Sequence, residues 1–139
     1  MTYHLDTNAV IAVLNNRPEA AREKLKAVLA TGHAPVAISS TVLYELRYGA
    51  ARSAQPEKNV ERLRVFLAGP VDVAHFGEED AAIAGNLRAT LEGAGTPIGP
   101  YDLLIAAQAL RCGATLITAN TSEFARVPGL ALENWCEAT

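Results

Sequence analysis

The chain has 139 residues, of which 50% are hydrophobic and 19% are charged, enough for one globular domain with a sizeable core. We therefore expect a single domain over residues 1–139. No apolar stretch approaches the roughly 20 residues that span a bilayer, and the start MTYHLDTN lacks the pattern of a secretory signal, so we expect a cytoplasmic protein without membrane contact. Cys112 and Cys136 form no C-x-x-C pair, which argues against a disulfide framework or a thiolate zinc site.

The net charge of −3 argues against a nucleic-acid partner, because phosphate binding depends on Lys and Arg. The charge is unevenly distributed, however. Residues 1–64 hold nine Lys/Arg and six Asp/Glu, whereas residues 65–139 hold three and nine, which gives +3 and −6. A basic patch on an acidic body is one interpretation, and two solvated helix faces are the other.

Short apolar segments alternate with helical patterns from one end of the chain to the other. Strands are expected at residues 3–5, 36–38, 71–73, 115–117 and 130–135. Helices are expected at 9–14, 18–30, a segment around Glu45 that ends at Gly49, 56–67, 78–92 and 101–112. This order predicts an α/β sandwich around a mainly parallel sheet.

Two polar residues directly follow predicted strands. Asp6 ends the first strand, and Asn120 comes shortly after the strand at 115–117. Ligand sites in such sheets gather beyond the carboxyl ends of the strands. We therefore expect both side chains at the same edge of the sheet.

Two further acids stand in apolar company within predicted helices. Glu45 shares a helical stripe with Val42, Leu46 and Gly49, and Asp102 begins the stripe of residues 105, 106 and 109. Carboxylates are rarely buried unless they are paired or bound to a metal. No Lys or Arg stands at helical spacing on either stripe.

Three acids brought together would repel one another unless a cation were present. Oxygen ligands favour hard ions such as Mg²⁺ or Mn²⁺ over zinc. Such an ion lowers the pKa of a bound water and stabilises charge on a phosphoryl group. Asp6, Glu45 and Asp102 are therefore candidate metal ligands, and phosphodiester hydrolysis is the expected chemistry.

Each residue also has a plainer interpretation. Asp6 fits an ordinary helix N-cap, Glu45 a half-exposed helix residue, and Asp102 a first-turn acid that interacts with the helix dipole. Thr118 and Asn120 fit turn residues that cap the next helix. We assign the acidic triplet at 78–80 to helix stability, and the histidines at 4, 33 and 75 to structural or surface roles.

Four motifs occur in an order that resembles the VapC branch of the PIN-domain ribonucleases, over nearly the whole chain. They are LDTN at 5–8, ELRYG at 45–49, PIGPYD at 97–102 followed by IAA at 105–107, and LITANTSEF at 116–124. The segments PGL at 128–130 and ENW at 133–135 resemble the usual tail. The resemblance implies the PIN-like three-layer α/β/α fold.

The resemblance also implies a function and its site. Asp6, Glu45 and Asp102 match acidic metal ligands, Asn120 matches an Asp or Asn that completes the site, and Thr7, Asn8 and Thr118 match supporting polar residues. The implied protein is an Mg²⁺- or Mn²⁺-dependent endoribonuclease, the homodimeric toxin of a type II toxin-antitoxin pair. Its substrate would be a structured RNA such as tRNA or ribosomal RNA. A VapB-type antitoxin would neutralise it, and contact with DNA would arise only through that complex.

Two positions depart from the family pattern. Ala119 stands where relatives often carry Asn or Arg, and Tyr101 stands where Leu is usual beside the catalytic Asp. A loss of one RNA contact and a gain of a base-stacking ring are the expected consequences, although Tyr101 also fits a packing role. Asn120 in place of Asp leaves three formal negative charges, which weakens the case for a second metal.

Two other functions are alternatives. Asp6 after the first strand also fits HAD-like phosphatases that form an aspartyl-phosphate, but these need a second Asp where Asn8 stands and a later Lys, and no Lys follows Lys58. A catalytically silent PIN-fold binding module is the other alternative. An intact acidic trio argues against it.

Overall fold

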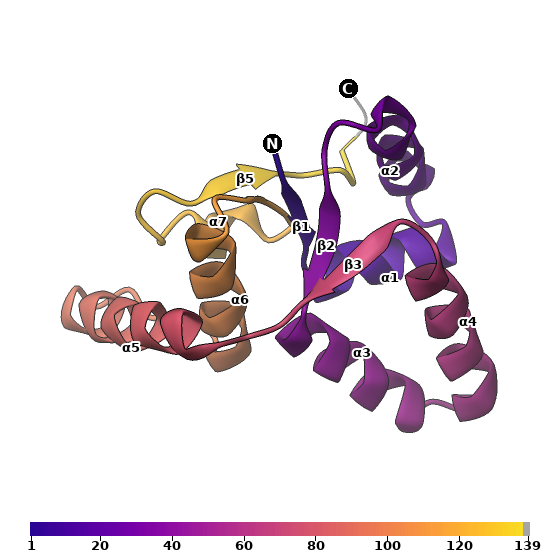
Figure 1. Ribbon diagram of the computed structural model, residues 1–139. Helices are drawn as coiled ribbons and strands as arrows, with labels where there is room; N and C mark the ends of the chain where they lie inside the picture. The colour runs from indigo at the N-terminus through magenta and orange to yellow at the C-terminus, as the bar shows by residue number, and fades with distance from the viewer. Residues whose placement is uncertain (138–139) are drawn as a thin grey trace.

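The structure, a computed structural model, describes residues 1–137, which fold into five strands and seven helices (Figure 1). The strands are β1 (Tyr3–Leu5), β2 (Val36–Ser39), β3 (Val71–Ala74), β4 (Thr115–Ile117) and β5 (Ala131–Glu133). The helices are α1 (Thr7–Asn15), α2 (Glu19–Thr31), α3 (Ser40–Ala51), α4 (Pro56–Ala68), α5 (Glu78–Gly93), α6 (Pro100–Arg111) and α7 (Thr121–Phe124). Within the described residues, no helix is long and apolar enough to cross a membrane.

All five strands run parallel, in the order β3-β2-β1-β4-β5. The chain builds outward from β1 through β2 to β3, and then crosses back to place β4 on the other side of β1. Tyr3 in β1 lies opposite Val36 of β2 and Thr115 of β4. The direction of winding therefore reverses between β1 and β4, which is where parallel sheets open a crevice for ligands.

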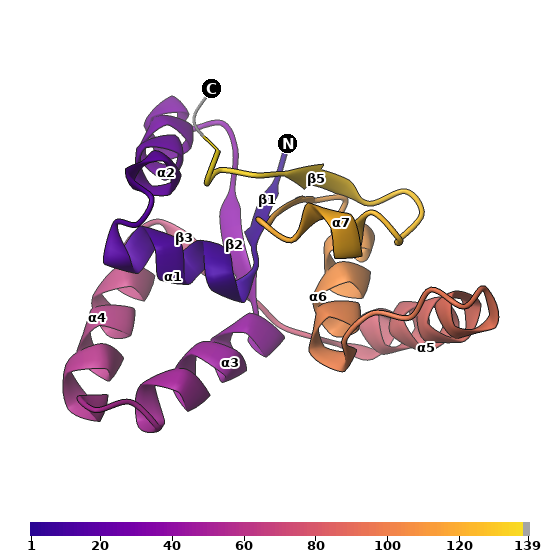
Figure 2. The ribbon, with the colours of Figure 1, turned by 180° about the vertical axis from the view of Figure 1, so that it is seen from behind.

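The helices form two groups on opposite sides of the sheet. Figure 1 and the reverse view in Figure 2 place α1 to α4 on one side and α5 and α6 on the other. Right-handed crossovers put helices on opposite faces when the winding direction reverses. The predicted three-layer α/β/α sandwich around a parallel sheet is confirmed.

The core forms where apolar strands meet the inward faces of these helices. Leu5, Ile38 and Leu116 have no exposed surface, because both faces of a parallel sheet are covered by helices. In α6 the buried side chains are small, with Ala106 and Ala107 fully enclosed. Small residues let a helix approach the sheet closely, which holds α6 and its first turn firmly against β4.

Some element boundaries differ from the predicted ones. α3 continues through Gly49 to Ala51, because an exposed glycine costs a helix only about 1 kcal/mol. α2 begins at Glu19 with Pro18 as its N-cap. The last strand, predicted at 130–135, is confined to Ala131–Glu133.

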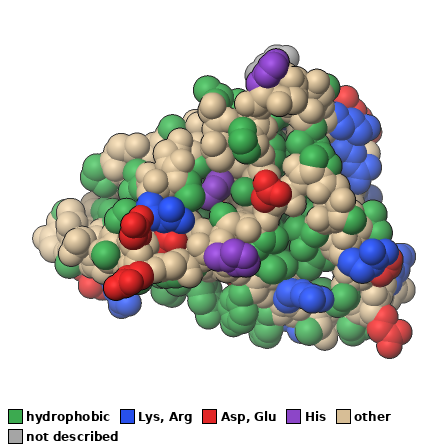
Figure 3. Space-filling view, in the orientation of Figure 1, with side chains coloured by type: hydrophobic (Ala, Val, Ile, Leu, Met, Phe, Trp, Pro, Cys, Tyr) green, Lys and Arg blue, Asp and Glu red, His purple; other side chains and the backbone are tan. Residues whose placement is uncertain are grey.

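Several cations of residues 1–64 serve the fold itself. Arg22 donates to the carbonyl oxygens of Val13 and Leu14, and Arg62 also donates to Leu14. Cations at a helix C-terminus satisfy its free carbonyls and its dipole, so both arginines cap α1. Figure 3 shows blue side chains along the right-hand edge, where Figure 1 places α2 and α4. Some of the positive charge of residues 1–64 therefore stabilises the end of α1 and is not free to bind phosphate.

Candidate active site

Asp6 stands at the carboxyl end of β1, where it also begins α1. Its Oδ1 accepts a hydrogen bond from the backbone N–H of Ala9 at 2.8 Å, so the predicted N-cap role is real. The side chain is buried. Burial raises the pKa of Asp6, the hydrogen bonds from Thr118 and Ala9 oppose that rise, and the charge of Glu45 adds to it. Asp6 is thus both a cap and a member of an acidic cluster.

Glu45 reaches the same edge from α3. The Thr7 hydroxyl, in the first turn of α1, donates to Glu45 Oε1 at 2.6 Å and so ties α3 to the end of β1. Glu45 is half-buried above the buried residues Val42 and Leu46. The predicted inward stripe is wrong at Gly49, which is exposed, because the buried face of α3 follows Val42, Leu46 and Ala50 at four-residue spacing.

Asp102 lies in the first turn of α6, next to Glu123 of α7. The backbone N–H of Gly99 donates to Glu123 Oε1 at 2.8 Å. Burial raises the pKa of Asp102 to about 7, with further contributions from the charge and hydrogen bond of Glu123 and from the charges of Glu45 and Asp6. The Gly99 bond lowers the pKa of Glu123. Asp102 therefore binds a proton more readily than Glu123 does.

This pairing leads to a prediction for the metal-free protein. Replacing Glu123 by Gln removes a negative charge beside Asp102 but keeps a side chain of the same size. The pKa of Asp102 is expected to fall from about 7 toward the range of ordinary carboxyl groups. Carboxyl-carbon NMR titration of both proteins in chelator measures the shift. An unchanged pKa would show that burial alone holds the proton on Asp102.

Glu123 was missed as a site residue, although it lies within the LITANTSEF motif. Asn120 Nδ2 donates to Glu123 Oε2, which places the two residues together at the start of α7. One signal in the sequence could have found Glu123. It stands three residues after Asn120, a spacing that puts two side chains on the same side of a helix, and it directly precedes the buried Phe124.

The remaining predicted residues take unequal positions. Thr118 is fully buried, hydrogen-bonds Asp6 and accepts from the backbone N–H of Asn120 at 2.9 Å, so it supports the site. Asn120 is exposed and contacts Glu123. Asn8 is exposed on the first turn of α1. Thr7 and Thr118 thus make contacts that fit the predicted supporting role, whereas the exposed Asn8 makes none that is described.

The cluster carries unbalanced negative charge. Among residues 1–137, no Lys or Arg forms an ion pair with Asp6, Glu45 or Asp102. The carboxylates raise one another's pKa values, which is the behaviour of an acidic set that lacks a counter-cation. In the described residues, no three His, Cys, Asp or Glu side chains converge on one point at metal-binding distance. Glu45 and Glu123 are instead turned toward protein donors.

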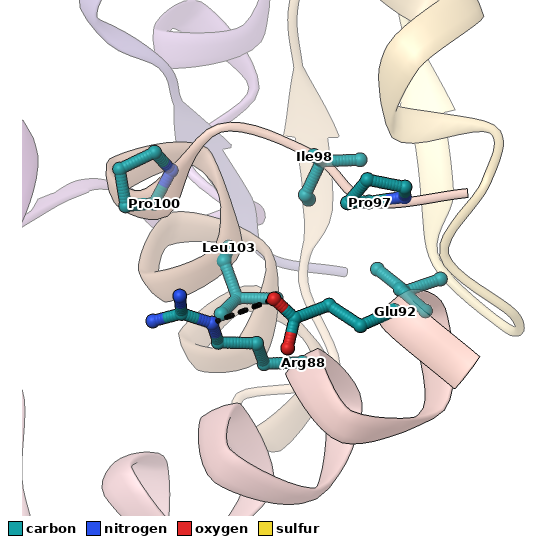
Figure 4. A pocket seen from close by; sticks show the side chains of 7 residues that line it. Arg88, Glu92, Pro97, Ile98, Pro100 and Leu103 are labelled. Carbon is teal, nitrogen blue, oxygen red and sulfur yellow. Dashed lines mark hydrogen bonds and ion pairs between the residues drawn. The ribbon is translucent and has the colours of Figure 1, made fainter. Parts of the chain in front are cut away.

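A separate hollow lies behind the loop that leads to Asp102. It encloses about 110 Å³ between α5 and residues 97–100, and Leu103 forms part of its wall (Figure 4). Arg88 and Glu92 of α5 pair across its mouth at 3.4 Å. On the other side of this loop, Gly99 faces Asp102 and Glu123. The loop therefore divides the acidic site from an apolar hollow.

One buried acid has a second role besides the helix stabilisation predicted for it, because Asp80 forms the capping box of α5 and also an ion pair. Asp80 was assigned with Glu78 and Glu79 to helix stability, yet its side chain has no exposed surface. It accepts from the backbone N–H of Gly77 at 2.8 Å and pairs with Arg111, beside the buried His4. This pair was not predictable from a local pattern, because Arg111 stands 31 residues away. The structural role predicted for His4 is confirmed.

The fold and the acids at its switch point define the PIN domain, whose family model matches residues 3–130. The chain belongs to the VapC ribonucleases of the PIN-domain family. It is 39% identical to the tRNA(fMet)-specific endonuclease VapC of Salmonella typhimurium, over 98% of this chain and 99% of that protein. It is 41% identical to ribonuclease VapC2 of Rickettsia felis, over 97% of this chain and 98% of that protein.

Solved structures agree with this membership. The crystal structure of VapBC2 from Rickettsia felis bound to a promoter DNA fragment superimposes with a TM-score of 0.89 and 40% identity, covering 97% of this chain and 99% of that chain. DNA-bound VapBC from Salmonella typhimurium gives a TM-score of 0.87 and 39% identity, covering 98% and 99%. The predicted family is confirmed.

Proposed function

We propose that this chain is an Mg²⁺- or Mn²⁺-dependent endoribonuclease in which Asp6, Glu45 and Asp102 hold the ion and Asn120 completes the site. The observation that carries the metal proposal is the set of carboxylates at the carboxyl edge of the sheet, with Asp6 buried and Glu45 tied to α1, to which no Lys or Arg of residues 1–137 is paired. The raised pKa of Asp102 is consistent with it. Carboxylate oxygens are the ligands that these hard ions prefer. A bound ion would supply an activated water and would stabilise charge on the phosphoryl group.

The residues of the chain have defined tasks in this proposal. Ala9 and Thr118 fix the carboxylate of Asp6 at the end of β1, and Thr7 orients Glu45. Gly99 and Asn120 hold Glu123 beside Asp102. Asp102 must lose its proton to bind a cation, so the ion and the proton compete for that side chain.

The substrate and partners follow from the relatives. The Salmonella relative is a tRNA(fMet)-specific endonuclease, and we propose a structured RNA, tRNA or ribosomal RNA, as the substrate here. The two structures compared above are VapBC complexes bound to DNA. A VapB-type antitoxin is therefore the proposed partner, with DNA contacted through that complex. A single domain over residues 1–139, a homodimer and a cytoplasmic location complete the proposal.

The test is cleavage of purified tRNA and ribosomal RNA under defined metal conditions. We expect cleavage with Mg²⁺ or Mn²⁺, none in chelator, and recovery when the metal is restored. Mapping the new RNA ends would identify the bond that is cut. Full activity in chelator would contradict the metal proposal, while hydrolysis of para-nitrophenyl phosphate in place of RNA would favour a phosphatase.

A further inference from the structure

Two exposed tyrosines stand at the rim of the acidic site. Tyr44 directly precedes Glu45 in α3, and Tyr101 directly precedes Asp102 in α6. Their side chains are 51% and 45% exposed, and their ring centroids lie 5.6 Å apart with planes tilted by 53°. Large aromatic rings are usually at least partly covered. Two exposed rings side by side, each next to a carboxylate of the site, therefore indicate a surface that binds a ligand.

The tyrosines form one wall of an open hollow. It measures about 320 Å³ and is completed by Ser40, Thr41, Phe76 and Leu104. This volume falls at the lower end of the roughly 300–1,000 Å³ typical of pockets for organic ligands. The rings of Tyr44, Tyr101 and Phe76 and the side chain of Leu104 give it an apolar lining, and the Ser40 hydroxyl is already bonded to Ala74 and Phe76, which suits the apolar face of a flat ring.

The exposed aromatic surface continues along α3. Tyr48 follows Tyr44 by one helical turn and is 56% exposed, so both rings lie on one face of the helix. The guanidinium of Arg52, one further turn on, lies 5.7 Å from the centroid of the Tyr48 ring. We call Tyr101, Tyr44, Tyr48 and Arg52 the aromatic stripe. It leads away from Asp102 and Glu45 along the outside of α3.

The charge around the stripe suits a polyanion. Between residues 40 and 56 the only acid is Glu45, which belongs to the site, whereas Arg47 and Arg52 are both exposed cations. Exposed aromatic rings interleaved with arginines are the means by which proteins hold single-stranded nucleic acid. The stacking surface of a base is apolar and its phosphate is negative, so the stripe complements both.

We propose that the aromatic stripe is a base-stacking track that holds an unpaired RNA segment and leads one nucleotide over Tyr44 and Tyr101 to the acids. This proposal rests on the proposed function and concerns the part of the RNA that the protein binds. RNA is the expected ligand because the stripe leads directly to the acids, where the substrate must bind. Structured RNAs offer unpaired loops whose bases are free to stack on such rings.

The test measures RNA binding separately from cleavage. The full chain carrying Asp6→Asn is mixed with a labelled single-stranded RNA of about 12 nucleotides that contains one 2-aminopurine. We expect Tyr44→Ala and Tyr48→Ala each to weaken binding by roughly 5- to 100-fold and to lose the quenching of 2-aminopurine that stacking produces. Tyr44→Phe and Tyr48→Phe are expected to bind as the parent does, because stacking requires the ring and not the hydroxyl.

Val65→Ala, which truncates a side chain that is 58% exposed on α4, is the control away from the stripe and should leave binding unchanged. The base-stacking proposal would be contradicted if the alanine variants bound RNA as tightly as the parent, or if the parent did not bind RNA. A changed sedimentation coefficient in Tyr44→Ala with unchanged quenching would assign this face to a second copy of the chain and also overturn it. Cleavage by the wild-type chain, followed in parallel with Mg²⁺, shows whether the proposed function itself fails.

Discussion

Replacing Asp102 by Asn is expected to reduce RNA cleavage by roughly 10³-fold or more, because an amide neither carries the charge that holds a cation nor changes its protonation. Asp6→Asn should lose activity to a similar extent. Asn is as good an N-cap as Asp, so the loss at Asp6 should leave α1 intact. Initial rates of cleavage with Mg²⁺, compared at equal protein concentration, measure both effects.

The stability of the same variant separates chemistry from folding. Asp102 has a pKa raised from 3.8 to about 7, so its carboxyl contributes stability while it is protonated, and that stability is lost as pH rises from about 4 through 7. In chelator at pH 8, Asp102→Asn should therefore melt higher than the wild type, by roughly 3–5 °C once solvent screening is allowed for. At pH 4 the two proteins should melt at nearly the same temperature.

A matched control is available on β3. Asp72→Asn makes the same chemical change at an exposed residue outside the acidic cluster, and it should retain wild-type cleavage. Near-normal activity of Asp102→Asn with Mg²⁺ would remove that carboxylate from the site. Equal losses in Asp72→Asn and Asp102→Asn would indicate a general effect of net charge on RNA binding instead.

The parts of the site that follow strands were predictable from the sequence. A short apolar strand ending in Asp6 fixes that side chain at the carboxyl edge of a parallel sheet, whatever the rest of the chain does. The same reasoning placed Asn120 after β4. Asp102 was predictable because a helix that packs against the sheet along Ile105, Ala106 and Ala109 has only one orientation.

Contacts between distant elements were not predictable in this way. Glu123 joins the site only because the loop at residues 97–100 presents the N–H of Gly99 to it, and no local pattern encodes that approach. Tyr44 and Tyr101 pair only because α3 and α6 bring the two rings side by side. These pairings depend on how α3, α6 and α7 meet at the sheet edge, which the periodicity of any single helix does not specify.

The ion pair between the buried Asp80 and the partly exposed Arg111 is another contact between distant elements. Asp80 has no exposed surface and joins the start of α5 to the end of α6. Replacing Asp80 by Asn keeps the shape but removes the charge that pairs with Arg111, whose own side chain is 32% exposed. Because the guanidinium left behind stays in contact with solvent, the loss is that of one charge-assisted pair rather than of a fully buried one. The melting temperature should fall by roughly 5 °C. Glu79→Gln, one residue away and exposed, is the matched control and should melt as the wild type does.

The pH dependence of this effect has the opposite sign to that of Asp102. Burial alone would raise the pKa of Asp80, but the hydrogen bonds from Arg111 and Gly77 and the charge of Arg111 outweigh it and lower the pKa below 3.8. The pair therefore contributes stability above about pH 4 that is lost as pH falls through the lowered value. Thermal melts at pH 7 and in strong acid should show a large gap between Asp80→Asn and the wild type at pH 7 and a smaller one in acid. A gap that stays constant would mean that Asp80 acts through packing and its bond to Gly77 rather than through its charge.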